Sequence, residues 1–233
     1  MNKPDDLKTS GAIHRSPPPG LVAIVFLLFF AASVVANMVM TGGAPYPTPY
    51  LPIADLQDYY TRFPDAIKIA AFLQFGAMPP LGIFTATMVS RFLFHRVKVA
   101  GVYIALFGGL ASTFFLGVSS LTAWSLSQPG IATDAGAMRV AQLIAFAFGG
   151  FGHVVSLGIL LAGISIPGLV FRLIPRWVGW TGLMIAAICV LSYLSMIFPE
   201  FSMLLPLGRF PGYLWLIAAG FTLPKRRQVV VVP

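Results

Sequence analysis

The chain has 233 residues, of which 58% are hydrophobic and only 9% are charged. Soluble domains carry about 25% charged residues, so this composition cannot cover a water-exposed surface and excludes an ordinary soluble protein. The formal net charge is +8, but the basic residues lie between apolar segments. Membrane topology accounts for that placement, so we expect no nucleic-acid partner. The single cysteine, Cys189, excludes an internal disulfide and a CxxC site.

Six apolar segments are long enough to cross a bilayer core about 30 Å thick, which takes about 20 helical residues. The sequence therefore predicts an all-α, polytopic transmembrane bundle of six helices. The expected spans are about 21–40, 67–89, 99–121, 140–161, 178–198 and 202–223. The first is interpreted as an uncleaved span, because it is longer than the core of a signal peptide. A disordered cytoplasmic leader is expected at 1–19 and a basic cytoplasmic tail at 225–233.

The connection at 41–65 is rich in proline and tyrosine. Its prolines favour extended backbone up to residue 52, and Ile53–Arg62 is expected to form a short helix. The four tyrosines fit a headgroup region, where the ring is in apolar surroundings and the hydroxyl is wet. These residues are Tyr46, Tyr50, Tyr59 and Tyr60.

Six spans place both termini on the same side of the membrane. If that side is the cytoplasm, eleven Lys and Arg residues lie inside and four lie outside. The four outside are Arg62, Lys68, Arg139 and Arg209. This asymmetry favours the orientation with both termini in the cytoplasm.

Two pairs of spans suggest an internal duplication. The segment IKIAAFLQF from Ile67 resembles MRVAQLIAF from Met138, and the loop at 96–101 resembles the loop at 176–182. Spans 2–3 and 4–5 would then be a parallel repeat.

The fourth span contains His153, which is the only histidine within an apolar segment. Gln142 precedes it by eleven residues, so the two are expected to share a helix face. His153 is a candidate acid–base group or metal ligand. No carboxylate or second histidine is expected at its depth, however, so we expect no metal site and no cofactor. The alternative is a neutral histidine that is hydrogen-bonded to a serine, a threonine or a carbonyl.

Gln74 and Thr85 are also eleven residues apart, on the second span. They are expected to face Gln142 and His153. The four side chains either line a polar cavity between the two spans or form interhelical hydrogen bonds, each worth about 1 kcal/mol or less.

Arg209 is an unusual charge, because the sixth span has to begin near Ser202 to cross the bilayer and therefore contains it. A helix broken at Gly208–Pro211 would present a free amino end beside Arg209 that binds an anion. The alternative is an arginine that extends to the headgroups or pairs with Glu200 or Asp134.

Lys68 and Arg139 begin the second and fourth spans. They are expected to anchor these helices at the membrane interface. The alternative is that both join Arg209 in a cationic outer site for an anionic ligand.

The last two spans carry the sequence features of a known family. Pro-Arg-Trp-x-Gly-Trp opens the fifth span at Pro175, Phe-Pro closes it, and Pro-Leu-Gly, Leu-Trp-Leu and Gly-Phe follow in the sixth. This pattern, mainly over residues 174–221, resembles an uncharacterised bacterial family of six-span membrane proteins, a domain of unknown function. The resemblance implies a bacterial inner-membrane protein, and it implies no activity and no site residues.

The sequence has no Walker loop, HExxH motif, GxSxG motif or pair of carboxylates in a span, so enzymatic activity is left open but not favoured. Our hypothesis is an integral inner-membrane protein that binds a lipid or a small amphipathic or anionic molecule in a cavity open to the outer face, as a carrier or accessory subunit. The expected binding residues are Arg139, Gln142, Arg209, Gln74 and Lys68. The alternatives are a small membrane enzyme that uses His153, and a structural subunit of a homo-oligomer or a larger complex.

Overall fold

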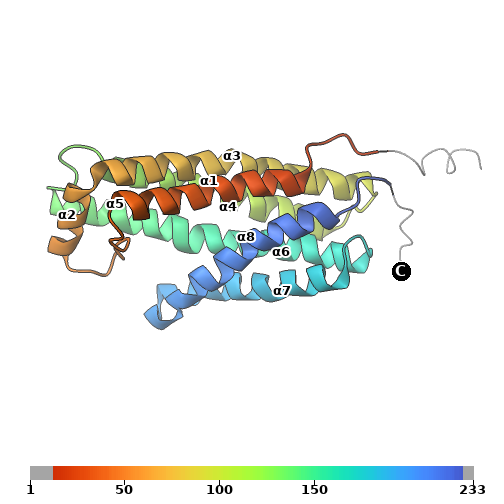
Figure 1. Cartoon of the computed structure of the whole chain (residues 1–233). Coiled ribbons are helices and arrows are strands. Elements are labelled where there is room, and N and C mark those ends of the chain that lie inside the picture. Colours follow the sequence, from red (N-terminus) through yellow and green to blue (C-terminus); the bar gives the residue numbers. More distant parts are fainter. Residues whose placement is uncertain (1–12, 228–233) are drawn as a thin grey trace, which may run out of the picture.

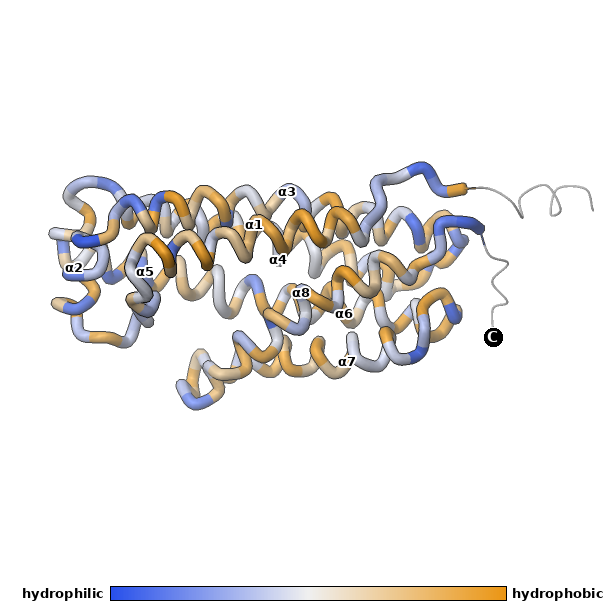
Figure 2. Tube along the Cα trace, viewed as in Figure 1, coloured by the Kyte–Doolittle hydropathy of each residue, from blue (hydrophilic) through white to orange (hydrophobic). Residues whose placement is uncertain are grey.

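A computed structural model describes residues 13–227 of the protein (Figure 1). Within these residues the chain is helical, without a strand, and six helical segments are long and apolar enough to cross a membrane. Hydrophilic residues gather toward the ends of the bundle, and its middle is apolar (Figure 2). The prediction of a polytopic bundle with six spans is confirmed at this level. The helices are α1 (Pro19–Met40), α2 (Ile53–Arg62), α3 (Pro64–Phe94), α4 (Ala100–Leu126), α5 (Ala135–Ala147), α6 (His153–Val170), α7 (Arg176–Leu191) and α8 (Leu204–Thr222).

The spanning helices form a ring in which neighbours along the chain are also neighbours in space. α1 packs on α3, α3 on α4, and α4 on both α5 and α6, which together make the fourth span. α6 packs on α7, α7 on α8, and α8 closes the ring against α1. Short connections join α3 to α4 and α6 to α7 as antiparallel neighbours, whereas the longer connection from α1 to α3 carries α2.

Both ends of the described chain meet at one end of the bundle, which we call the terminal end; the opposite end is the α2 end (Figure 1). Ile13 pairs with Arg226 in an isolated antiparallel bridge, and the His14 ring is 3.0 Å from the Ser90 hydroxyl. The sequence predicts a disordered leader up to residue 19, whereas these contacts order it from Ile13. Residues 1–12 of the leader and 228–233 of the tail lie outside the described part of the chain.

The spans differ greatly in length. α3 has 31 residues and the fourth span has 36, about 46 and 54 Å of helix at 1.5 Å per residue. α7 has 16 residues and α8 has 19, about 24 and 29 Å. Because all of them reach the terminal end, α3 and α5 extend beyond α7 and α8 at the α2 end (Figure 1). The ring is therefore incomplete there.

A small second core closes the α2 end. The helix α2 has the limits that the sequence predicts, and its apolar face packs on the ends of α3, α4 and α5 through Leu56, Tyr59 and Tyr60. Tyr60 is 1% exposed and Tyr59 is 7% exposed. The prediction that these two tyrosines lie among lipid headgroups is wrong, because α2 folds back onto the protein.

The sixth span is a continuous helix. α8 runs through Gly208 and Pro211 without a break, after a single 3₁₀ turn at Pro199–Met203. The predicted broken helix with a free amino end is therefore wrong. Proline is tolerated inside a membrane span because neighbouring groups can satisfy the backbone that it disturbs.

Close contact between α4 and α6 depends on glycine. A Cβ added at Gly163 would overlap the backbone of Ala105, and one added at Gly108 would overlap the backbone of Leu160. Small residues at such positions let two helix backbones approach each other, which is how membrane helices associate.

Gly163→Ala tests this contact. We expect it to lower the free energy of unfolding by about 1–3 kcal/mol, because the new methyl group meets backbone atoms that cannot move aside. Thermal unfolding in detergent measures the change. Gly82→Ala is the matched control, since its Cβ would lie 3.6 Å from the nearest atom of Thr113. An equal melting temperature for the two variants would contradict the close packing.

Candidate functional site

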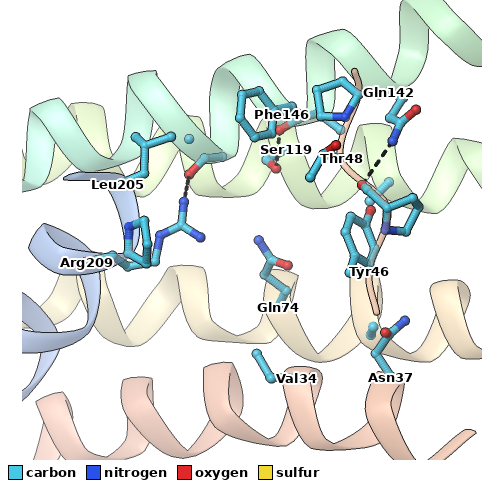
Figure 3. A pocket seen from close by; sticks show the side chains of 18 of the residues that line it. Val34, Asn37, Tyr46, Thr48, Gln74, Ser119, Gln142, Phe146, Leu205 and Arg209 are labelled. Carbon is cyan, nitrogen blue, oxygen red and sulfur yellow. Dashed lines mark hydrogen bonds between the residues drawn. The ribbon is translucent and has the colours of Figure 1, made fainter. Parts of the chain in front are cut away.

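A cavity of about 490 Å³ lies where the ring is incomplete (Figure 3). Its walls come from α1, α3, α4, α5 and α8, and the connection around residues 46–50 lies across it. Arg209 is the only charged side chain among the lining residues. The other polar lining includes Asn37, Gln74, Ser119 and Gln142, and the cavity is otherwise mostly apolar. Such a cavity suits a ligand with one charged group and an apolar body.

Arg209 points from α8 toward the fourth span and is only partly satisfied (Figure 3). Its Nη2 donates to the carbonyl of Gly149, whereas its buried Nε has no partner. Within residues 13–227 no carboxylate lies within ion-pair distance of it. Pairing with Glu200 or Asp134 is therefore ruled out, and Asp134 instead caps α5 by accepting a hydrogen bond from the Ala137 nitrogen at 2.9 Å.

The partner of Arg209 lies in an irregular turn. Phe148–Gly152 form a π-helix between α5 and α6. A π turn holds an additional residue, and at about 100° per residue this rotates the two halves of the span relative to each other. The structure does not bring Gln142 and His153 into one cavity: Gln142 lines it, whereas His153, eleven residues further along, does not.

Two deeply buried amides that line the same cavity, Gln142 and Asn37, also have unpaired atoms. Gln142 is 2% exposed; its Nε2 donates to the Pro47 carbonyl at 3.2 Å, and its Oε1 has no partner. Asn37 is 8% exposed; its Oδ1 accepts from the Tyr59 hydroxyl at 3.1 Å, and its Nδ2 has no partner. A buried polar atom without a hydrogen bond typically costs about 1–3 kcal/mol. The residues that line the cavity thus hold one unpaired acceptor and two unpaired donors, counting the Nε of Arg209.

Gln74 and Thr85, the two polar residues predicted to share a site on the second span, lie in different surroundings. Gln74 lines the cavity and points into it (Figure 3). Thr85 is fully buried elsewhere, beside Gly109, and its hydroxyl donates to the Leu81 carbonyl of its own helix at 3.0 Å. The two share a helix face but lie at different depths, about 16 Å apart along the axis.

The two basic residues expected at the binding site do not line the cavity. Arg139 donates from Nη1 to the carbonyls of Pro49 and Leu51, at 2.6 and 3.0 Å. It therefore holds the connection that covers the cavity. Lys68 is exposed at the start of α3.

Tyr46 fixes the same connection from the other side. Its hydroxyl accepts a hydrogen bond from Tyr60 at 3.3 Å. Burial raises the pKa of Tyr60, so its hydroxyl stays protonated at neutral pH and remains a donor.

His153 belongs to a separate, fully satisfied network. Its Nδ1 lies 3.0 Å from the Ser112 carbonyl, which can only accept, so Nδ1 carries the proton. Its Nε2 therefore accepts from the Tyr213 hydroxyl at 2.6 Å, and the Ser112 hydroxyl donates to the His153 carbonyl at 3.1 Å. The side chain is 0% exposed. This is the neutral, hydrogen-bonded histidine given as the alternative to a reactive one. No group of three potential metal ligands occurs among the described residues.

The sequence analysis missed Asn37, Tyr213 and the connection around Pro47. Signals for the first two exist: Asn37 is an amide in an otherwise apolar span, and Tyr213 follows Arg209 by four residues and so shares its face. Nothing in the sequence pairs Pro47 with Gln142, because this contact joins residues 95 positions apart.

Comparison with known proteins gives no assignment: no family model, no curated protein and no solved structure matches the chain. The function therefore has to be argued from the cavity itself.

Tyr213→Phe tests the His153 network. Removing the hydroxyl leaves Nε2 of His153 buried without a donor, so we expect a loss of about 1 kcal/mol in unfolding free energy. Unfolding by denaturing detergent measures it. Tyr193→Phe is the control, because Tyr193 is exposed and makes no hydrogen bond within residues 13–227. If both variants unfold like the wild type, the bond from Tyr213 to His153 contributes nothing to stability.

Arg139→Ala tests the anchor of the connection. Two backbone carbonyls lose their donor, so we expect faster proteolysis within residues 46–51, with the helical bundle still intact by circular dichroism. Lys68→Ala, which removes an equivalent charge without touching the connection, is expected to leave the cleavage rate unchanged. Equal cleavage rates in the two variants would refute the anchoring role.

Proposed function

We propose that this multi-pass membrane protein binds a small, singly charged anionic amphiphile in the cavity at its α2 end, as a carrier or as an accessory subunit. The observation that carries the proposal is that three residues lining this one cavity, Arg209, Asn37 and Gln142, each have a buried side-chain atom without a hydrogen-bond partner. A ligand toward which these side chains turn would satisfy those atoms and relieve the cost of leaving them unpaired.

The charge of the lining supports an anion. Arg209 lacks a carboxylate partner, and no other lining residue is charged. A charged hydrogen bond from a guanidinium to a carboxylate or phosphodiester is stronger than one between neutral groups. A single cation balances a single negative charge, which favours a carboxylate or a phosphodiester over a phosphate monoester with nearly two charges.

The proposed orientation follows from the distribution of basic residues. With the terminal end in the cytoplasm, the eleven-to-four division of Lys and Arg obeys the positive-inside rule. The cavity then lies in the half of the protein that is nearer the outer face. A bacterial inner-membrane location and membership of the uncharacterised six-span family remain part of this proposal, and they rest on the resemblance at residues 174–221.

A parallel repeat of spans 2–3 and 4–5 is also proposed, and the turns at the terminal end support it. Arg96 after α3 and Arg172 after α6 both have positive φ, 63° and 55°. The residue after each arginine donates back to a carbonyl five positions earlier, Val97 to Phe92 and Leu173 to Gly168. This Schellman geometry ends both helices and aligns Arg96 with Arg172, rather than with Arg176 as the loop sequences suggest.

The alternative roles receive less support. An enzyme that uses His153 would need a substrate to reach its ring, but the side chain is 0% exposed and does not line the cavity. A purely structural subunit needs no cavity lined by a single charged residue without a carboxylate partner.

Arg209→Ala tests the proposed function. In detergent or nanodiscs, we expect a dansyl-labelled fatty acid to bind about 10–100 times more weakly, because a charged hydrogen bond contributes about 1.5–3 kcal/mol. Arg209→Lys keeps the charge but loses the Nε donor, so its affinity for the probe should lie between those of the wild type and Arg209→Ala. Fluorescence titration measures all three.

The control is Arg176→Ala, which removes an exposed arginine at the terminal end. It should bind the probe like the wild type. Identical affinities for the wild type and Arg209→Ala would refute the proposed function.

A further inference from the structure

We infer that the ligand enters the cavity sideways, from the membrane leaflet at the α2 end, through an opening between α1 and α8. Its occupant is a single-chain amphiphile whose anionic head lies on Arg209 and whose hydrocarbon chain passes between Val34 and Phe210. This inference rests on the proposed function and adds the route and the class of ligand.

The route from the aqueous side is covered by a tethered segment. The connection across the cavity is held by Arg139 at Pro49 and Leu51 and by Gln142 at Pro47. Entry along the bundle axis would require these three hydrogen bonds to break together.

The seam between α1 and α8 is closed near the terminal end. A Cβ added at Gly220 would overlap the backbone of Gly20, so the two helices touch there. Further along, Phe26 and Phe30 pack edge-on against the Tyr213 ring, with centroids 4.7 and 4.9 Å apart. Nothing can pass between the helices over this stretch.

The seam loosens toward the α2 end. The rings of Phe30 and Phe210 still pair edge-on across it, but with centroids 6.4 Å apart, near the upper limit for an aromatic contact. Toward the α2 end, α8 reaches only as far as its first residue, Leu204, while α1 continues to its last residue, Met40. Val34 on α1 and Phe210 on α8 both line the cavity, yet each is 48% exposed. These two residues therefore bound a side opening.

The surface around the opening is apolar. Exposed hydrophobic side chains flank it on both helices: Val35 and Met38 on α1, and Leu207 on α8. Such a surface in a membrane span contacts lipid chains rather than water. The hydrocarbon chain of an amphiphile that passes through this opening stays in lipid, while the head group of the same molecule reaches Arg209.

The single cysteine of the chain makes a direct test possible. In a Cys189→Ala background, Val34→Cys and Phe210→Cys are introduced and bridged across the opening with a short, reducible bifunctional thiol reagent. In nanodiscs, we expect bridging to slow association of the dansyl-labelled fatty acid by about tenfold or more. Reduction of the bridge should restore the rate, which shows that the fold is intact. Each single-cysteine variant, treated in the same way, is the control.

Competition with the labelled probe identifies the head group. An unlabelled fatty acid and a lysophosphatidylglycerol each carry one negative charge, and whichever displaces the probe distinguishes carboxylate from phosphodiester. A neutral monoacylglycerol should displace it at least about tenfold less well. Equal displacement by the neutral lipid would overturn the anionic head.

The two proposals fail in different ways. If bridged and reduced proteins bind the probe at the same rate while Arg209→Ala still weakens binding, the side entry is wrong and the proposed function stands. If Arg209→Ala binds the probe like the wild type, the proposed function itself is wrong.

Discussion

The hydrogen bond from Arg209 to the Gly149 carbonyl is the contact on which the cavity depends. It joins α8 to the π turn of the fourth span. An arginine in a membrane span costs about 2.5–3.5 kcal/mol or more, and one bond to a neutral carbonyl leaves Nε unpaired. The charge is thus held in place without being neutralised, which is the condition for an anion-binding group that is ready before the ligand arrives.

A comparison with the neighbouring polar contact shows how different this arrangement is. Tyr213 lies one turn after Arg209 on α8, and His153 lies one turn after Gly149, so the two contacts are successive links between the same helices. In the second link, both nitrogens of His153 and the hydroxyl of Ser112 are paired. A fully paired network stabilises and specifies a core, whereas a partly paired one costs stability. This difference supports a structural role for His153 and the binding role that we propose for Arg209.

The sequence predicts the architecture well because hydrophobic length is a local property. The six spans and the helix Ile53–Arg62 follow from composition and proline placement alone. The site is predicted only in part: Gln74, Gln142 and Arg209 meet in one cavity, and Arg139 and Lys68 do not. Two causes are physical. The π turn at Phe148–Gly152 changes the helical periodicity between Gln142 and His153, and regular helical spacing does not predict it. Arg139 donates hydrogen bonds to the carbonyls of Pro49 and Leu51. Every residue has a backbone carbonyl, so the sequence does not indicate which carbonyls an arginine will bind.

The unequal lengths of the spans explain why a cavity exists at all. Regular helices of equal length would fill the ring at both ends with interdigitating side chains. Here α7 and α8 are shorter than α3 and the fourth span, so one side of the ring lacks a helical wall at the α2 end. In water such a gap would expose apolar side chains such as Val34 and Phe210. In a bilayer it faces hydrocarbon, and a lipid chain completes the wall at little cost. The same shortening that opens the ring therefore underlies the proposed side entry, which admits molecules that already reside in the membrane.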